Sequence, residues 1–379
     1  MVKQIGWFGL GLIFLLSTGT QAAENKSWTE RLKLSGDFRY RHELISEEKF
    51  GSPENVRLPD RNRQRLRLRV MIQAEVNPQM DVIARLASGV GEPVSTNQDF
   101  SGGFSQKQIW IDRAYLDYHP CANSWGRAGK FAHPFEATDL IWDPDLNPEG
   151  LAVGSVLKMD QHEFFFRLGG LWAAERKSAD GPDQGLFGAQ VGGHAVSGMT
   201  SGMLGVAYYD YGNVQNGPTI YSTTKGFGNS VYSDGARLLY RNDYNLFDAT
   251  GELKTKLATT ELSALGELVM NTAAEPDSGS DKKNDTAWLA GLAFKFKKLP
   301  FDWSLAYNYR DVQANAAIGA FIDSDAGGGN TNFNGHKISI AVAPLTKTKF
   351  GVTYFRNTLD PDGAKLAYNR LQVDFEAKF

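Results

Sequence analysis

The chain has 379 residues, a formal net charge of −3 at pH 7 and one cysteine. A charge balance this small excludes bulk affinity for nucleic acid, and a single cysteine excludes an intramolecular disulfide framework. With 40 glycines, 23 phenylalanines and 14 tyrosines, the composition favours strands and tight turns over helices, and so an all-β protein.

The first 23 residues have the layout of a secretory signal peptide. Lys3 precedes an apolar core from Ile5 to Leu16, and small and polar residues follow up to Ala22 and Ala23. A membrane anchor is the alternative, but this core is too short to span a bilayer as a helix. We therefore expect cleavage after Ala22 or Ala23 and one exported domain over residues 24–379.

Sixteen runs with a period of two follow the signal peptide. This period places apolar side chains on one face of a strand and polar ones on the other. In chain order the runs lie at 32–44, 62–76, 81–89, 109–119, 125–131, 150–158, 162–172, 186–196, 201–211, 235–256, 261–271, 286–296, 302–310, 336–343, 348–357 and 369–379. Because the number is even and the first and last runs are amphipathic in the same sense, the pattern favours closure into a barrel.

The connections between these runs alternate between short and long. The short ones resemble turns and lie at 77–80, 120–124, 159–161, 197–200, 257–260, 297–300 and 344–347. The others are long and polar, at 45–61, 90–107, 132–149, 173–185, 212–234, 272–285, 313–335 and 358–367. A closed antiparallel sheet with its turns at one end and its loops at the other produces this alternation, as transmembrane β-barrels do.

The second run carries four arginines at alternate positions, Arg63, Arg65, Arg67 and Arg69, opposite an aliphatic row. Arginines two apart on a strand lie about 7 Å from each other, and their repulsion is roughly 2.4 kcal/mol per pair at an effective dielectric constant of 20. A narrow aqueous lumen would require opposing carboxylates. A soluble sandwich or barrel with the aliphatic rows turned inward is the alternative, because alternation alone fits both.

Aromatic residues lie at the ends of the apolar rows, as in the interfacial girdles of membrane barrels: Trp28, Tyr40, Tyr118, Trp303, Tyr307, Tyr309, Tyr354, Phe375 and Phe379. The chain ends on Phe379, with Val373 and Phe375 on the same face. This ending resembles the last strand of bacterial outer-membrane proteins, whose closing Phe is part of the signal read by the barrel-assembly machinery. Over its mature length the chain resembles the sixteen-stranded bacterial porins, above all the family catalogued as putative porins.

The resemblance includes GRAGKF (126–131) and the following loop, which are similar to the porin strand and third loop that folds back into the barrel. The loop has no Lys or Arg and five acids: Glu136, Asp139, Asp143, Asp145 and Glu149. The first five strands carry cations predicted to face inward: Arg39, Arg41, Arg63, Arg65, Arg67, Arg69, Arg85, Arg113 and Arg127. By resemblance, the loop acids oppose these bases and create a transverse field in a constriction.

Two alternatives remain open for this site. The acidic loop fits an external, solvated loop as well, and some arginines fit structural pairs with Asp37, Glu75 and Asp117. Arg127 is the weakest member of the set, because strand alternation places either Arg127 or Lys130 inside, not both.

Other kinds of site lack support. Asp143, Asp145 and Asn147 begin like a calcium loop, but Pro148 replaces the required Gly and Gly154 the required Glu. The six histidines lack ligand spacing, and no GxSxG, CxxC or phosphate loop occurs. We therefore expect neither a metal, nor another cofactor, nor catalytic residues.

The sequence indicates a passive, water-filled channel for small hydrophilic solutes or ions in the outer membrane of a Gram-negative bacterium. By resemblance, the chain forms a homotrimer in outer-membrane lipid and meets the barrel-assembly machinery through its last strand. An outer-membrane enzyme of lipase or protease type and a barrel that sheathes a partner protein are the alternatives.

Overall fold

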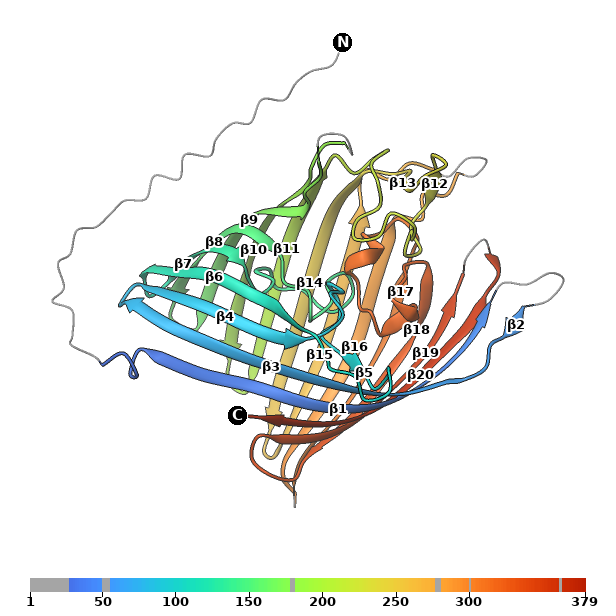
Figure 1. Cartoon of the computed structure of the whole chain (residues 1–379). Helices are drawn as coiled ribbons and strands as arrows, with labels where there is room; N and C mark the ends of the chain where they lie inside the picture. Colours follow the sequence, from blue (N-terminus) through green and yellow to red (C-terminus); the bar gives the residue numbers. More distant parts are fainter. Residues whose placement is uncertain (1–26, 50–54, 178–180, 277–280, 300, 361–362) are drawn as a thin grey trace, which may run out of the picture.

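The protein is a closed antiparallel β-barrel (Figure 1), seen in a computed structural model that describes residues 27–49, 55–177, 181–276, 281–299, 301–360 and 363–379. Sixteen long strands form the wall, and β20 pairs with β1 to close it. In chain order they are β1 (Leu32–Lys49), β3 (Arg61–Asn77), β4 (Met80–Ser88), β6 (Ile109–Cys121), β7 (Ser124–Lys130), β8 (Glu149–Met159), β9 (His162–Ala174), β10 (Gln184–Ser197), β11 (Thr200–Gly212), β14 (Tyr244–Leu257), β15 (Thr260–Asn271), β16 (Thr286–Leu299), β17 (Phe301–Val312), β18 (Phe333–Ala343), β19 (Thr348–Leu359) and β20 (Leu366–Lys378).

The sixteen strands confirm the predicted number and order. The run 235–256 does not form a single strand, because the wall strand begins at Tyr244. The residues before it belong to a small hairpin in the loop region, formed by β12 (Val231–Ser233) and β13 (Leu238–Tyr240). Alternation alone cannot separate a wall strand from a hairpin that precedes it at the rim.

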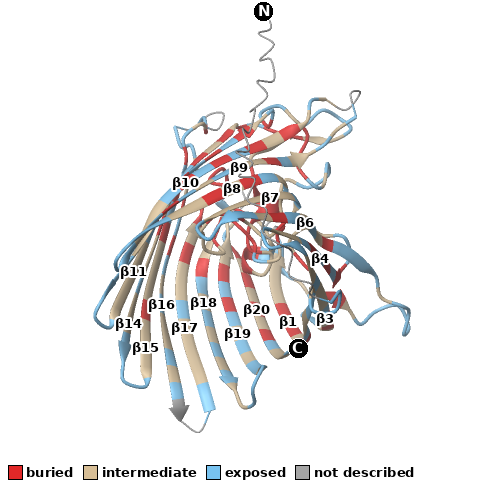
Figure 2. Ribbon diagram, turned by 90° about the vertical axis from the view of Figure 1, so that its left-hand side faces the viewer, coloured by how far each residue is buried: buried red, intermediate tan, exposed pale blue. Residues whose placement is uncertain are grey.

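The apolar rows face outward and the polar rows inward. On β3, Leu68 and Ile72 are 37% and 46% exposed, whereas Arg65 and Arg67, on the opposite face of the same strand, are 7% and 9% exposed. Figure 2 shows the resulting alternation of burial along the tall strands. This arrangement is the one that a lipid-facing surface requires, and it contradicts a soluble barrel with its aliphatic rows turned inward. In the ranges that the structure covers, no helix is long and apolar enough to cross a membrane.

The turns lie at one end of the barrel and the long loops at the other, as predicted. Two short strands, β2 (Val56–Arg57) and β5 (Gln98–Asp99), extend the sheet within the loops. The wall is uneven in height (Figure 1), because β1 has 18 residues whereas β7 has 7. The low side of the barrel contains the two shortest wall strands, β4 with 9 residues and β7 with 7, and β6 between them.

Two of the long loops fold into the barrel. The first inner loop (131–148) joins β7 to β8, and the second inner loop (313–332) joins β17 to β18 and contains two short 3-10 helices, η2 (Gly319–Phe321) and η3 (Ala326–Gly328). Their apolar residues form much of the buried core, together with inward side chains of the wall.

The second inner loop corrects the prediction of a polar external loop at 313–335. Ala316, Ile318 and Ile322 are at most 1% exposed. The apolar stretch NAAIGAFI (315–322) gives the reason, because it buries its side chains against the other loops and the wall instead of meeting water.

Candidate pore constriction

Six arginines form a double row on the lumen side of β1 and β3, called here the arginine ladder: Arg39, Arg41, Arg63, Arg65, Arg67 and Arg69. In the register of these strands Arg39 stands opposite Arg67, and Arg41 stands opposite Arg65. Like charges directly opposite each other destabilise an antiparallel pair. The wall must therefore supply carboxylates close to this double row.

Acids of β1 supply the first set of counter-charges. The Asp37 carboxylate accepts from Arg67 and Arg69, with closest N–O distances of 2.8 Å to each. Glu43, which is fully buried, pairs with Arg63 and lies 3.8 Å from Arg65. Asp37 is one of the three acids named in the alternative of structural pairing, whereas the sequence reasoning did not name Glu43.

The last strand supplies the second set. Arg41 donates to both oxygens of Asp374 at 2.7 Å, the forked geometry that makes arginine–carboxylate pairs strong. Glu376 lies 3.7 Å from Arg39 and 3.8 Å from Arg67. The ladder is thus largely neutralised at the seam where β20 meets β1.

The remaining predicted cations also have partners close by. Arg85 pairs with Asp112, and Arg113 donates to the side chain of Asn147 at 2.7 Å. Both Asp112 and Arg113 turn toward the lumen because a bulge interrupts the pairing of β4 with β6 between Arg85 and Leu86.

Arg127 and Lys130 lie three positions apart on β7, at positions of opposite strand parity. Arg127 lies 3.3 Å from Asp117, and Lys130 donates to the carbonyl oxygen of Asn147 at 3.0 Å. The pairing of β7 with β6 and β8 continues without a register shift from Arg127 to Lys130, so the expectation that only one of the two faces the lumen remains a prediction.

The first inner loop crosses the lumen, so its acids reach different parts of the wall. Asp145 meets the ladder: it accepts from Arg69 at 3.1 Å and from the backbone and hydroxyl of Thr96 at 3.1 and 3.0 Å. Glu136 instead lies 2.6 Å from Arg167 on β9.

Asp139 binds the wall formed by β17 and β18. Its carboxylate accepts from Arg310 at 2.9 Å and also pairs with Lys337. Both cations lie on the polar rows of predicted strands, yet sequence reasoning did not single them out. Their partner Asp139 is distant along the chain, 171 positions from Arg310.

Asp143 and Glu149 do not meet the ladder. Asp143 accepts from the backbone nitrogens of Asp145 and Ser324, each at 2.8 Å, and thereby joins the two inner loops. Glu149 is the exposed first residue of β8 and pairs with Lys130 at 2.8 Å. Of the five loop acids, Asp145 alone pairs with one of the nine predicted cations, and the charged constriction remains a prediction.

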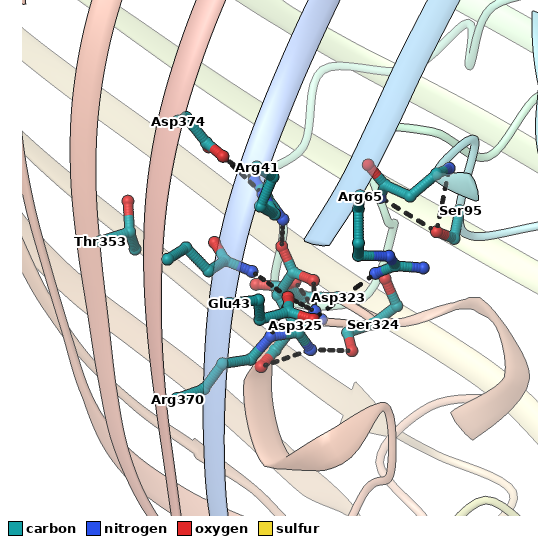
Figure 3. A network of polar contacts seen from close by, with 12 residues as sticks. Arg41, Glu43, Arg65, Ser95, Asp323, Ser324, Asp325, Thr353, Arg370 and Asp374 are labelled. Atoms are coloured by element: carbon teal, nitrogen blue, oxygen red, sulfur yellow. Dashed lines mark hydrogen bonds and ion pairs between the residues drawn. The ribbon is translucent and has the colours of Figure 1, made fainter. Parts of the chain in front are cut away.

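The second inner loop contributes acids that the sequence reasoning missed. Asp325 lies 3.1 Å from Arg41 and 2.6 Å from Arg370, and Arg370 also pairs with Glu43 (Figure 3). Asp323 lies 3.1 Å from Arg310. The available signal was the acidic stretch DSD (323–325), which directly follows the apolar run of this loop.

Burial raises the pKa values of the loop carboxylates, and ion pairs lower them. Burial alone would raise the pKa of Asp139, but Arg310 and Lys337 hold it below its usual range. Against a similar burial effect, Arg370 and Arg41 hold the pKa of Asp325 well below its usual range. Burial and the neighbouring Asp323 raise the pKa of Asp143 well above its usual range. Burial lowers the pKa of His133 to about 3.

Two glycines of the wall, Gly169 and Gly188, leave room for the aromatic side chain at the tip of the first inner loop and are called here the glycine cradle. Phe135 packs on Gly169 and Gly188, where a Cβ would come within 3.1 and 2.5 Å of its ring. Its ring also meets Tyr209 edge to face, with centroids 5.2 Å apart. A side chain at Gly188 would therefore displace the loop.

Glu267 fixes the middle of the same loop. This carboxylate of β15 is 3% exposed and accepts from the backbone nitrogen of Thr138 at 2.9 Å and from its hydroxyl. Its other oxygen is buried without a hydrogen-bond partner. In the part of the chain that the structure describes, no group of three or more His, Cys, Asp or Glu residues is placed to hold a metal ion.

Comparison with known proteins identifies the family. The model of a family described as "Putative porin" matches residues 45–247 and 238–379. The chain belongs to this porin family. The porin is therefore a protein of the bacterial outer membrane. No curated protein matches the chain in sequence.

Solved structures share the fold of the porin. The outer membrane channel DcaP of Acinetobacter baumannii is 14% identical, with a TM-score of 0.52 over 92% of this chain and 97% of that chain. OmpTdeltaL8, a loop L8 deletion mutant of OmpT from Vibrio cholerae, is 12% identical, with a TM-score of 0.52 over 92% and 99%. OmpT of the same organism in its trimer form is 11% identical, with a TM-score of 0.50 over 92% and 99%.

Proposed function

We propose that this porin is a passive, water-filled channel for small hydrophilic solutes or ions, narrowed where the first inner loop meets the arginine ladder. The contact of Asp145 with Arg69 carries the proposal, because it brings loop and ladder together inside the barrel. Solutes would pass between a wall rich in guanidinium groups and a loop rich in carboxylates, and a transverse field there favours polar solutes over apolar ones.

The field in this proposal is local, because most of the ladder is already paired within the wall. Arg67 and Arg69 share Asp37, and Arg41 is engaged by Asp374. Selectivity would then depend on the few positions where a guanidinium group and a loop acid meet, above all Arg69 and Asp145.

Conductance of the purified porin in a planar bilayer tests the proposal. We expect discrete conductance steps in the wild type, and a reversal potential under a salt gradient that moves toward cation preference in Arg69→Gln, because Asp37 and Asp145 each lose a cation. Arg57→Gln is the matched control, since Arg57 is an exposed arginine of β2 that pairs with Asp60 at 3.2 Å and is not among the predicted constriction residues.

Two outcomes would count against the proposal. Folded wild-type protein that produces no conductance steps would contradict the channel itself. Equal reversal potentials in the wild type and in Arg69→Gln would place the ladder outside the permeation path. The proposal includes no chemical reaction, and lipid or peptide hydrolysis by the purified protein would instead support the enzyme alternative.

We further propose a homotrimer that covers the low side of the barrel. The seven residues of β7 reach about 16 Å across the membrane at roughly 3.3 Å per residue and a tilt of about 45°, short of an apolar band about 25 Å tall. A second copy would cover this part of the wall better than lipid. The trimer form of OmpT, which has a similar fold, is consistent with this assembly.

A further inference from the structure

The two inner loops contact each other directly. The backbone nitrogen of Asp143 donates to the carbonyl oxygen of Phe321, and the backbone nitrogen of Ser324 donates to the carboxylate of Asp143, both at 2.8 Å. The rings of Trp142 and Phe321 stack with centroids 6.2 Å apart and an interplanar angle of 24°. A displacement of one loop would therefore disturb the other.

Arg310 holds both loops to the same point of the wall. This β17 residue is 1% exposed, and its guanidinium donates to Asp139 of the first inner loop at 2.9 Å and to Asp323 of the second at 3.1 Å. Lys337 on β18 pairs with Asp139 and lies 3.5 Å from Asp323. A planar guanidinium can engage two carboxylates at once, whereas an ammonium acts as a point charge.

The second inner loop has its other attachment at the arginine ladder. Two residues after Asp323, the carboxylate of Asp325 pairs with Arg370 at 2.6 Å and with Arg41 at 3.1 Å (Figure 3). Arg370 also donates to the carbonyl oxygen of Ser324 at 3.1 Å. The segment 323–325 therefore bridges the β17–β18 wall and the β20–β1 wall.

We propose that the second inner loop is a second constriction loop, and that Arg310 is the positioning residue that holds both inner loops as one body across the lumen. This inference rests on the proposed channel function. The narrowest cross-section is then set by the pair of loops, and the guanidinium of Arg310 fixes their mutual position without contacting the solute.

Single-channel recording of four variants tests the inference. Arg310→Gln removes the shared cation, so we expect a larger unitary conductance with frequent transitions between levels. Asp139→Asn and Asp323→Asn each release one attachment, so each is expected to have a smaller effect. Arg310→Lys keeps the charge but not the fork, and we expect it to restore the wild-type conductance only in part.

Double variants distinguish a positioning role of Arg310 from a general loss of stability. If Arg310 acts on both loops, Asp139→Asn and Asp323→Asn change the conductance little further in the Arg310→Gln background. Additive effects in that background would overturn the inference. Arg57→Gln, which removes an exposed arginine of β2 that pairs with Asp60, is the control and should leave the conductance levels unchanged.

A cross-link in the wild-type Arg310 background provides a measurement that does not depend on Arg310→Gln, and the same link can then be placed in that variant. Cys121 is the one cysteine of the chain and is exposed, so Cys121→Ser gives a background without thiols. In that background, W142C/F321C should react with a short bifunctional thiol reagent in the folded barrel and keep the wild-type conductance. In Arg310→Gln the same link should restore it.

The outcomes distinguish this inference from the channel proposal. Wild-type conductance steps together with unchanged steps in Arg310→Gln would overturn the inference and leave the channel intact. Failure of W142C/F321C to cross-link in a folded barrel would overturn it as well. The absence of steps in the wild type would instead contradict the proposed function.

Discussion

At the scale of single residues, the buried acid Glu267 holds the first inner loop through hydrogen bonds and not through an ion pair. It accepts two hydrogen bonds from Thr138, and among the residues with described positions no Lys or Arg lies within ion-pair distance of it. Removing a hydrogen-bond partner of a buried group costs about 1–3 kcal/mol. Removing only the charge of Glu267 leaves no cation unpaired.

We therefore predict that Glu267→Gln unfolds in detergent at close to the wild-type temperature, whereas Glu267→Ala unfolds at a lower temperature. The amide oxygen of Gln can still accept from Thr138, but Ala cannot. Thermal unfolding followed by circular dichroism measures the difference. Equal unfolding temperatures for the two variants would mean that the contact with Thr138 does not stabilise the first inner loop.

A second residue-scale prediction concerns the glycine cradle. Gly188→Val places a branched side chain where the ring of Phe135 lies, so the tip of the first inner loop must move. We expect new protease cleavage in residues 131–148 with the barrel still folded. Gly212→Val is the control, because a Cβ there meets no atom within 4 Å. Identical digestion patterns for the two variants would contradict the role of the cradle.

At the scale of elements, the strands could be predicted and the path of the loops could not. Alternation with a period of two is a local property of the chain, so it located the sixteen wall strands and the inward side of the ladder. The partners of the ladder are not local: Arg41 and Asp374 are 333 positions apart and become neighbours only when the barrel closes. The apolar stretch at 315–322 indicated burial of the second inner loop, but not what it packs against.

The attachments of the inner loops through Asp139 and Asp325 should resist moderate acid. Because the pKa values of Asp139 and Asp325 are lowered, their ion pairs contribute above the usual carboxylate range and are lost only as pH falls through the lowered values. The raised pKa of Asp143 has the opposite sign, so its contribution is greatest at low pH and declines as pH rises through the raised value. His133, with a pKa of about 3, stays neutral above that pH.

We predict that the contribution of the Asp139 and Asp325 ion pairs to the unitary conductance, measured as the effect of Asp139→Asn or Asp325→Asn, changes little between pH 7 and about pH 4, the range in which exposed carboxylates begin to protonate. Single-channel recording at steps across this range measures it. A sharp transition near pH 6 would contradict the ion-pair anchors as the controlling groups.

At the scale of the whole molecule, the last residue completes the barrel. The backbone nitrogen and oxygen of Phe379 each bond to Gly36, at 3.0 Å. A Cβ at Gly36 would come within 2.4 Å of the Phe379 ring, so only glycine allows this contact. The role of Phe379 as a signal for the barrel-assembly machinery remains a prediction, and its structural contact suggests a way to separate the two roles.

We predict that Phe379→Ala lowers the amount of folded porin in the outer membrane of expressing cells, while the same variant refolds in detergent with a yield close to that of the wild type. The hydrogen bonds of residue 379 are made by its backbone and survive the change. Heat-modified mobility on gels measures folded protein in both settings. An equal loss in cells and in detergent would assign Phe379 a structural role alone.

The charged seam between β1 and β20 also bears on how the ring finds its register. Arg39 and Arg41 stand opposite Glu376 and Asp374 in the closed barrel. Sliding β20 by two residues in one direction would set Arg39 against Lys378 and Glu43 against Asp374, two repulsive pairs. The ion pairs that line the lumen at this seam thus also disfavour that shift, and we expect a substitution that tunes permeation there to affect the pairing of β1 with β20 as well.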